Sequence, residues 1–142
     1  MKTRIAIILI LVLFIGKTVV SQNKDSIVFS KENIAIKLHE QTDKKFIIIS
    51  GTMKDSANSV SIPFGNILAY ENEVNLGRTT SDYDGNFIIK IDTSLIKGEI
   101  FDLKAVFVGY YNLPITGIPK MNKDYFLDLK LKANKAMRVF IK

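Results

Sequence analysis

The stretch GRTTSDYDGNFIIKI, residues 77–91, decides the fold that we expect for this chain. Its last five residues are aromatic, β-branched or lysine, a composition typical of a half-buried strand. The four residues Asp82-Tyr83-Asp84-Gly85 have the composition of a tight turn, in which Gly85 takes a positive φ and both aspartates bond amides of the turn. The stretch therefore predicts two strands joined by a turn, with Phe87 starting the second strand and pointing inward.

Alternation of apolar and polar residues continues on both sides of this turn. It is clearest at residues 101–107 and 125–131, where every second side chain would lie on one face. A strand carrying Pro114 would suit a sheet edge. The other predicted strands are residues 46–53, 66–70, 76–80, 87–91 and 111–115, with less regular candidates at 26–30, 33–38 and 137–141.

Helical features are few. Residues 92–98 predict one helical turn, with Asp92 or Thr93 as its N-cap and Gly98 as its end. Residues 22–142 contain no stretch of ten or more with an apolar period of 3.6. Short strands about every ten residues predict an all-β fold, an antiparallel Greek-key β-sandwich of about seven strands.

Three segments then occur in a recognisable order: ISGTMKD followed by IPFGNI, then GRTTSDYDGNF, then AVFVGY. In this order and spacing they resemble the carboxypeptidase regulatory-like domain, a prealbumin-like β-sandwich of the kind found in Bacteroidetes envelope proteins. The resemblance covers residues 46–131 and departs from the usual pattern at Met53, Asn66 and Ser81. It implies structural roles for Gly51, Pro63, Gly77, Asp82, Asp84, Gly85, Phe87, Gly109 and Tyr110.

Two of these residues have a clear physical reading. Gly109 would allow a bend or bulge at a strand end. Tyr110 would bury its ring and bond a loop carbonyl through its hydroxyl. The catalytic zinc domain after which that family is named has no counterpart here, so the resemblance implies an accessory module.

The first 21 residues predict a secretory signal peptide. Two basic residues precede an unbroken apolar run at residues 5–15, which is about half the length that a membrane span needs. Val19 and Ser21 suit the cleavage site, so the mature chain would begin at Gln22, although retention as an anchor stays open. We therefore expect an exported protein, located in the periplasm, at the outer-membrane surface or outside the cell, without a stable membrane span after cleavage.

Removing the signal changes the charge. The whole chain has 20 basic and 14 acidic residues, and loss of three basic residues with the signal leaves 17 against 14. Five of these lie in the last 13 residues, so the remaining body is slightly acidic and gives no reason to expect nucleic acid. The expected organisation is a signal peptide (1–21), an N-terminal extension with one or two strands (22–45), the sandwich (46–131) and a basic strand or tail (132–142). The lysines between Lys130 and Lys142 would protect an edge strand against aggregation.

Candidate sites are weak. Asp82, Asp84 and Asn86 could form an oxygen-rich ion site, although a structural turn is the favoured interpretation of these residues. His39 is the only histidine, which argues against a zinc site or a Ser-His-Asp triad. Tyr83, at the tip of a predicted turn, is the best candidate for stacking on a sugar ring.

These observations favour a non-enzymatic module without a cofactor. We expect it to mediate protein binding or assembly in the cell envelope, with another envelope protein or a polysaccharide as partner. A carbohydrate-binding module is the first alternative. A small hydrolase of transthyretin-like shape is the second, and the single histidine argues against it.

Overall fold

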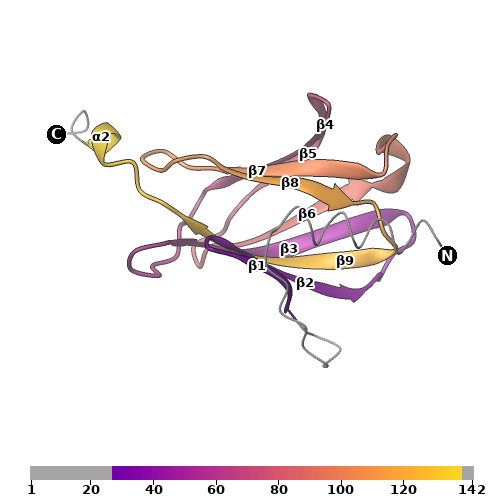
Figure 1. The fold of residues 1–142 in the computed structure, drawn as a ribbon, viewed down its shortest axis with the longest axis horizontal. Coiled ribbons are helices and arrows are strands. Elements are labelled where there is room, and N and C mark those ends of the chain that lie inside the picture. The colour runs from indigo at the N-terminus through magenta and orange to yellow at the C-terminus, as the bar shows by residue number, and fades with distance from the viewer. Residues whose placement is uncertain (1–26, 139–142) are drawn as a thin grey trace.

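The computed structural model describes residues 27–138, and their regular structure is almost entirely β-strand (Figure 1). The exceptions are a 3-10 turn, Thr93–Leu95, and one helical turn, α2, Lys135–Arg138. The strands are β1 (Ile27–Lys31), β2 (Ile34–Glu40), β3 (Phe46–Asp55), β4 (Asn66–Glu71), β5 (Val74–Thr80), β6 (Asn86–Asp92), β7 (Ile100–Val106), β8 (Leu113–Pro119) and β9 (Lys123–Leu131).

The strands form two layers, which confirms the predicted β-sandwich. One sheet has five strands in the order β1-β2-β9-β3-β6, and the other has four in the order β5-β4-β7-β8. The seven strands expected between residues 46 and 131 are β3 to β9, and β1 and β2 extend the five-stranded sheet to give nine. The chain passes from one layer to the other after β3, β5, β6 and β8, so neighbours in sequence often lie in different sheets.

Strand β9 is the centre of the five-stranded sheet. It pairs with β2 in antiparallel fashion and with β3 in parallel fashion, the one parallel pairing among the described strands. Lys130 therefore lies on an inner strand, and the prediction that lysines of this region protect a sheet edge is wrong for β9. Strand β8, which carries Pro114, does lie at an edge of the four-stranded sheet.

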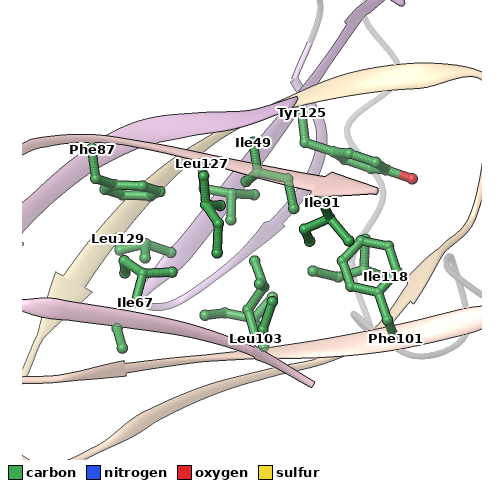
Figure 2. Packing of buried hydrophobic residues seen from close by; sticks show 14 of the residues in the cluster. Ile49, Ile67, Phe87, Ile91, Phe101, Leu103, Ile118, Tyr125, Leu127 and Leu129 are labelled. Atoms are coloured by element: carbon green, nitrogen blue, oxygen red, sulfur yellow. The ribbon is translucent and has the colours of Figure 1, made fainter. Parts of the chain in front are cut away.

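The core follows the predicted alternation. On β7, Phe101, Leu103 and Ala105 are buried, and on β9 the four residues Tyr125, Leu127, Leu129 and Leu131 are buried. Figure 2 shows five of these side chains, Phe101, Leu103, Tyr125, Leu127 and Leu129, pointing into the space between the two sheets, where Phe87 and Ile91 of β6 also lie. Phe87 points inward as expected and is 3% exposed.

Two local predictions need correction. Asp92 caps the 3-10 turn by accepting the Ser94 amide at 2.9 Å, but the turn ends at Ile96, and Gly98 instead donates its N–H to Glu71. Residues 135–138 are helical, so the strand expected at 137–141 is wrong where it falls within the described residues. Its last part and the predicted signal peptide lie outside them.

Candidate functional site

The segments that carry the sequence motifs meet at one end of the sandwich, which we call the motif end. It consists of the β3–β4 loop (56–65), the β5–β6 turn (81–85), the β7–β8 loop (107–112) and the segment after β9 (132–138). Strand directions bring them together, because β3, β7 and β9 finish where β4 and β6 begin. The opposite end carries residues 41–45, 72–73, 93–99 and 120–122.

Asp55 joins two of the motifs at the motif end. Its side chain is 4% exposed and accepts the Ala57 amide at 2.8 Å through Oδ1 and the Tyr110 hydroxyl at 2.8 Å through Oδ2. The Tyr110 hydroxyl was expected to bond a loop carbonyl, and a carboxylate takes that place. Since Asp55 ends β3 and Tyr110 follows β7, this bond ties the β3–β4 loop to the β7–β8 loop.

The β5–β6 turn packs directly on β3. Asp82 Oδ1 accepts the amides of Asp84 and Asn86, both at 2.9 Å, as expected for a turn stabilised by its own aspartate. Gly85 has φ +78°, and its carbonyl accepts the Met53 amide at 2.8 Å. A Cβ at Gly85 would lie 2.5 Å from the Met53 carbonyl oxygen, so this position needs glycine for space as well as for φ.

Ser81 fixes the β3–β4 loop from the other side. It is 2% exposed, donates its hydroxyl to the Ile62 carbonyl at 2.7 Å and accepts the Gly65 amide at 2.9 Å. Backbone bonds of Ser81 with Gly65 and Phe64 run beside these. Ser81 therefore holds the loop that contains Pro63.

The remaining motif glycines have different reasons. At Gly51, a Cβ would overlap the Leu127 carbonyl oxygen of the neighbouring strand β9, so glycine permits the parallel β3–β9 pairing. Gly77 lies at the irregular step where β5 gains one residue against β4. Gly109 has φ +87° in the loop after β7, in agreement with the predicted bend.

Five large hydrophobic side chains are exposed on the motif-end loops. We call four of them the loop hydrophobics, Val60, Phe64, Tyr83 and Val108, and the fifth, Tyr111, lines the groove described below. Tyr83 is 80% exposed, and its ring lies 5.0 Å from that of Phe64 in an edge-to-face arrangement. Val108 is 75% exposed in the β7–β8 loop. Sequence analysis found only Tyr83, because an isolated hydrophobic residue in a loop carries no periodic signal.

A lysine-lined groove lies beside these loops, with a volume of about 520 Å³. It runs between the β1–β2 turn, the start of β8, the end of β9 and α2. Its lining residues are Asn33, Tyr111, Asn112, Leu113, Lys130, Lys132, Ala133, Lys135 and Ala136. The sequence indicated a basic C-terminal region, but not that Asn33 and Tyr111 would face it.

Asp82, one of the three residues predicted as a possible ion site, has a structural role in its own turn. Asp82 is occupied by backbone amides, and within residues 27–138 no group of three or more His, Cys, Asp or Glu side chains could hold a metal ion. His39 lies on β2 opposite Asp124, toward the opposite end and away from the loop hydrophobics. Among the described residues no helix is long and apolar enough to cross a membrane.

Three side chains near the opposite end have pKa values shifted from their usual range. The amides of Lys97 and Gly98 bond the Glu71 carboxylate and lower its pKa, and the Ser94 hydroxyl and amide lower the pKa of Asp92. Burial raises the pKa of Tyr125, whose hydroxyl donates to the Pro119 carbonyl at 2.6 Å. Each of these groups holds a turn or a core position.

No protein-family model matches the chain, and no curated protein sequence matches it significantly. Solved structures with a similar course of the chain include three enzymes. They are 3-chlorocatechol 1,2-dioxygenase from Rhodococcus opacus 1CP (9% identity, 66% of this chain and 62% of that one, TM-score 0.41), hydroxyquinol 1,2-dioxygenase from Pseudomonas putida DLL-E4 (12%, 93% and 75%, 0.46) and a 9R-lipoxygenase from Cyanothece PCC8801 (14%, 94% and 24%, 0.44).

These likenesses are distant. The chain spans 62% of the chlorocatechol dioxygenase and 24% of the lipoxygenase, so large parts of both enzymes have no counterpart in it. At such identities and TM-scores they support no statement about activity.

Proposed function

We propose that this chain is a non-enzymatic binding module of the cell envelope, which recognises another envelope protein through its motif end. The observation that carries the proposal is the exposed ring pair of Phe64 and Tyr83, together with exposed Val60 and Val108 on loops at the same end. The predicted signal peptide supports the envelope location, and the resemblance to carboxypeptidase regulatory-like domains supports an accessory role.

Hydrogen bonds from buried residues fix the backbone of the two loops that carry Val60, Phe64 and Tyr83. Asp55, Ser81 and Gly85 bond the backbone of the β3–β4 loop and the β5–β6 turn, as described above. Exposed aromatic side chains on a fixed backbone lose little conformational entropy on binding, and aromatic residues dominate the energetics of many protein interfaces. A rigid sandwich presenting apolar loop tips is therefore suited to docking against a protein surface.

The proposal can be tested by site-specific photo-crosslinking in the producing cell. A photoreactive phenylalanine analogue placed at Tyr83 should yield one reproducible adduct, identified by mass spectrometry. The same analogue at Leu95, which is 49% exposed at the opposite end, is the matched control. Adding Phe64→Ser and Val108→Ser should abolish the Tyr83 adduct. Equal adducts from both positions, or none from Tyr83, would contradict the proposal.

A carbohydrate-binding module is the second candidate, favoured by the edge-to-face pair of Phe64 and Tyr83. An exposed ring held by a second ring can stack on the apolar face of a sugar. A glycan array would decide between the two, since sugar-dependent binding lost in Tyr83→Ala supports the sugar and its absence excludes it. A hydrolase is the least supported candidate, and it would fail if His39→Ala left any detected activity unchanged.

A further inference from the structure

The lysine-lined groove lies beside the loop hydrophobics and is formed by different side chains. Three of its lining residues are lysines, Lys130, Lys132 and Lys135, and none of the lining residues within 27–138 is Asp or Glu. None of the three forms an ion pair with a residue in the described range, where the salt bridge of Lys123 with Glu40 lies at the opposite end. The three lysines therefore give the described lining of the groove a net positive charge.

The walls of the groove are bonded to one another. The Lys130 amide donates to the Asn33 carbonyl at 2.9 Å, and the Tyr111 amide donates to the Lys132 carbonyl at 2.9 Å. A third bond, from the Asn134 amide to the Gly109 carbonyl at 2.8 Å, fixes the segment after β9 against the β7–β8 loop. Segments 33, 109–111 and 130–134 thus form one connected backbone unit, and a ligand need not assemble the groove.

The remaining lining residues are not those of a simple anion site. Tyr111 is 53% exposed and lines the groove together with the half-buried Leu113, so an aromatic and an aliphatic side chain both contribute to it. Asn33 and Asn112 supply amide groups that both donate and accept hydrogen bonds. The groove volume of about 520 Å³ falls within the range of small-ligand sites, which is roughly 300–1,000 Å³.

We propose that this groove binds a carboxylate-bearing oligosaccharide. A uronic-acid unit has an apolar C–H face for Tyr111, hydroxyl groups for Asn33 and Asn112, and a carboxylate for the lysines. An acidic peptide would satisfy the lysines, and its backbone could pair with the two amides. A chain of acidic residues has no ring with a C–H face to match Tyr111. The site uses none of the loop hydrophobics, so it stands independently of the protein-binding role proposed above.

Isothermal titration of the full chain with a short oligogalacturonate tests the proposal. Poly-glutamate serves as the acidic peptide and a cello-oligosaccharide as the neutral sugar. We expect the oligogalacturonate to bind, and binding to weaken as salt is raised, because exposed charge contacts are screened. Lys132→Gln with Lys135→Gln should weaken it roughly fivefold to tenfold, since contributions of exposed charges are modest.

Matched variants separate this groove from a general effect of charge. Lys44→Gln with Lys90→Gln removes two exposed lysines elsewhere and should leave the affinity unchanged. Tyr111→Ala should weaken oligogalacturonate binding, and Phe64→Ser with Tyr83→Ser should not. The proposal is overturned if poly-glutamate or the neutral sugar binds as tightly, if nothing binds, or if Tyr111→Ala has no effect while circular dichroism shows a folded protein.

Discussion

The two ends of the sandwich use the same device in different surroundings. At the motif end, Asp55 accepts the Ala57 amide at 2.8 Å from a carboxylate that is almost fully buried. At the opposite end, Glu71 accepts the Gly98 amide and Asp92 accepts the Ser94 amide, both in an exposed setting. A hydrogen bond contributes modestly to stability when water can replace it, whereas a buried polar group without a partner is costly. Equal geometry therefore does not mean equal importance.

One carboxylate toward the opposite end is also buried, and it separates the effect of burial from the effect of position. Asp124, toward the opposite end, is 7% exposed and accepts the Ile48 amide at 3.0 Å and the Thr42 hydroxyl at 2.9 Å. It ties the β2–β3 loop to β9. Burial, and not position at one end or the other, is thus the variable that should decide the size of each effect.

Glycine substitution should produce the largest difference between the ends. Gly85→Ala places a Cβ 2.5 Å from the Met53 carbonyl oxygen at φ +78°, and we expect it to lower the free energy of unfolding by about 3 kcal/mol. Gly98→Ala meets only the Glu71 carboxylate, the movable end of an exposed side chain, and should cost much less. Urea denaturation measures both.

Gly109→Ala separates the two causes at Gly85. Gly109 has φ +87° but no atom within 4 Å of a Cβ, so the substitution tests the backbone angle alone and should cost about 1 kcal/mol. A cost for Gly85→Ala no larger than that for Gly109→Ala would show that close packing on β3 contributes nothing.

Removal of the buried carboxylate should come next in size. Asp55→Ala deprives the Tyr110 hydroxyl and the Ala57 amide of their acceptor, and we expect a loss of about 2 kcal/mol in the free energy of unfolding. Tyr110→Phe removes one of these bonds and should cost about 1 kcal/mol. If Asp92→Ala, at the exposed turn, destabilises the protein as much as Asp55→Ala, burial is not the deciding variable.

The buried faces of individual strands and the tight turn at the motif end were predictable from the sequence. Alternation at residues 101–107 and 125–131 predicted the buried faces of β7 and β9, because side-chain period depends only on local geometry. Asp82 and Gly85 predicted their turn correctly for the same reason, since turn residues act through local geometry. The sandwich follows from such local signals added together.

Relations between distant segments were not predictable in the same way. The bond between Asp55 and Tyr110 joins residues 55 positions apart, and the parallel pairing of β3 with β9 joins strands separated by five others. A period-two pattern gives the inner face of a strand but not its neighbour. The groove shows the same limit, since Asn33, Tyr111 and Lys132 meet only because β2, β8 and β9 place them there.

The smallest effect should be a change in pH dependence at the opposite end. The amides of Lys97 and Gly98 bond the Glu71 carboxylate at 2.8 and 2.6 Å and hold its pKa below the usual 4.5. A carboxylate whose pKa is lowered by folding stabilises the protein above its unfolded pKa, and this contribution is lost as the pH falls through the lower, folded value. Glu71→Gln should therefore lower the Tm slightly at neutral pH, and this difference from wild type should shrink as the medium is acidified below pH 4.5.

Glu99→Gln changes an exposed glutamate of the same end and is the charge-matched control. The measurement is thermal unfolding followed by circular dichroism over this pH range. A constant difference between Glu71→Gln and wild type at all pH values would mean that the two hydrogen bonds from the Lys97 and Gly98 amides do not distinguish the ionised Glu71 carboxylate from its protonated form. Glu71 would then make no pH-dependent contribution, and the hydrogen bonds of Asp92 and Asp124 would remain among the side-chain carboxylate contacts that hold this end.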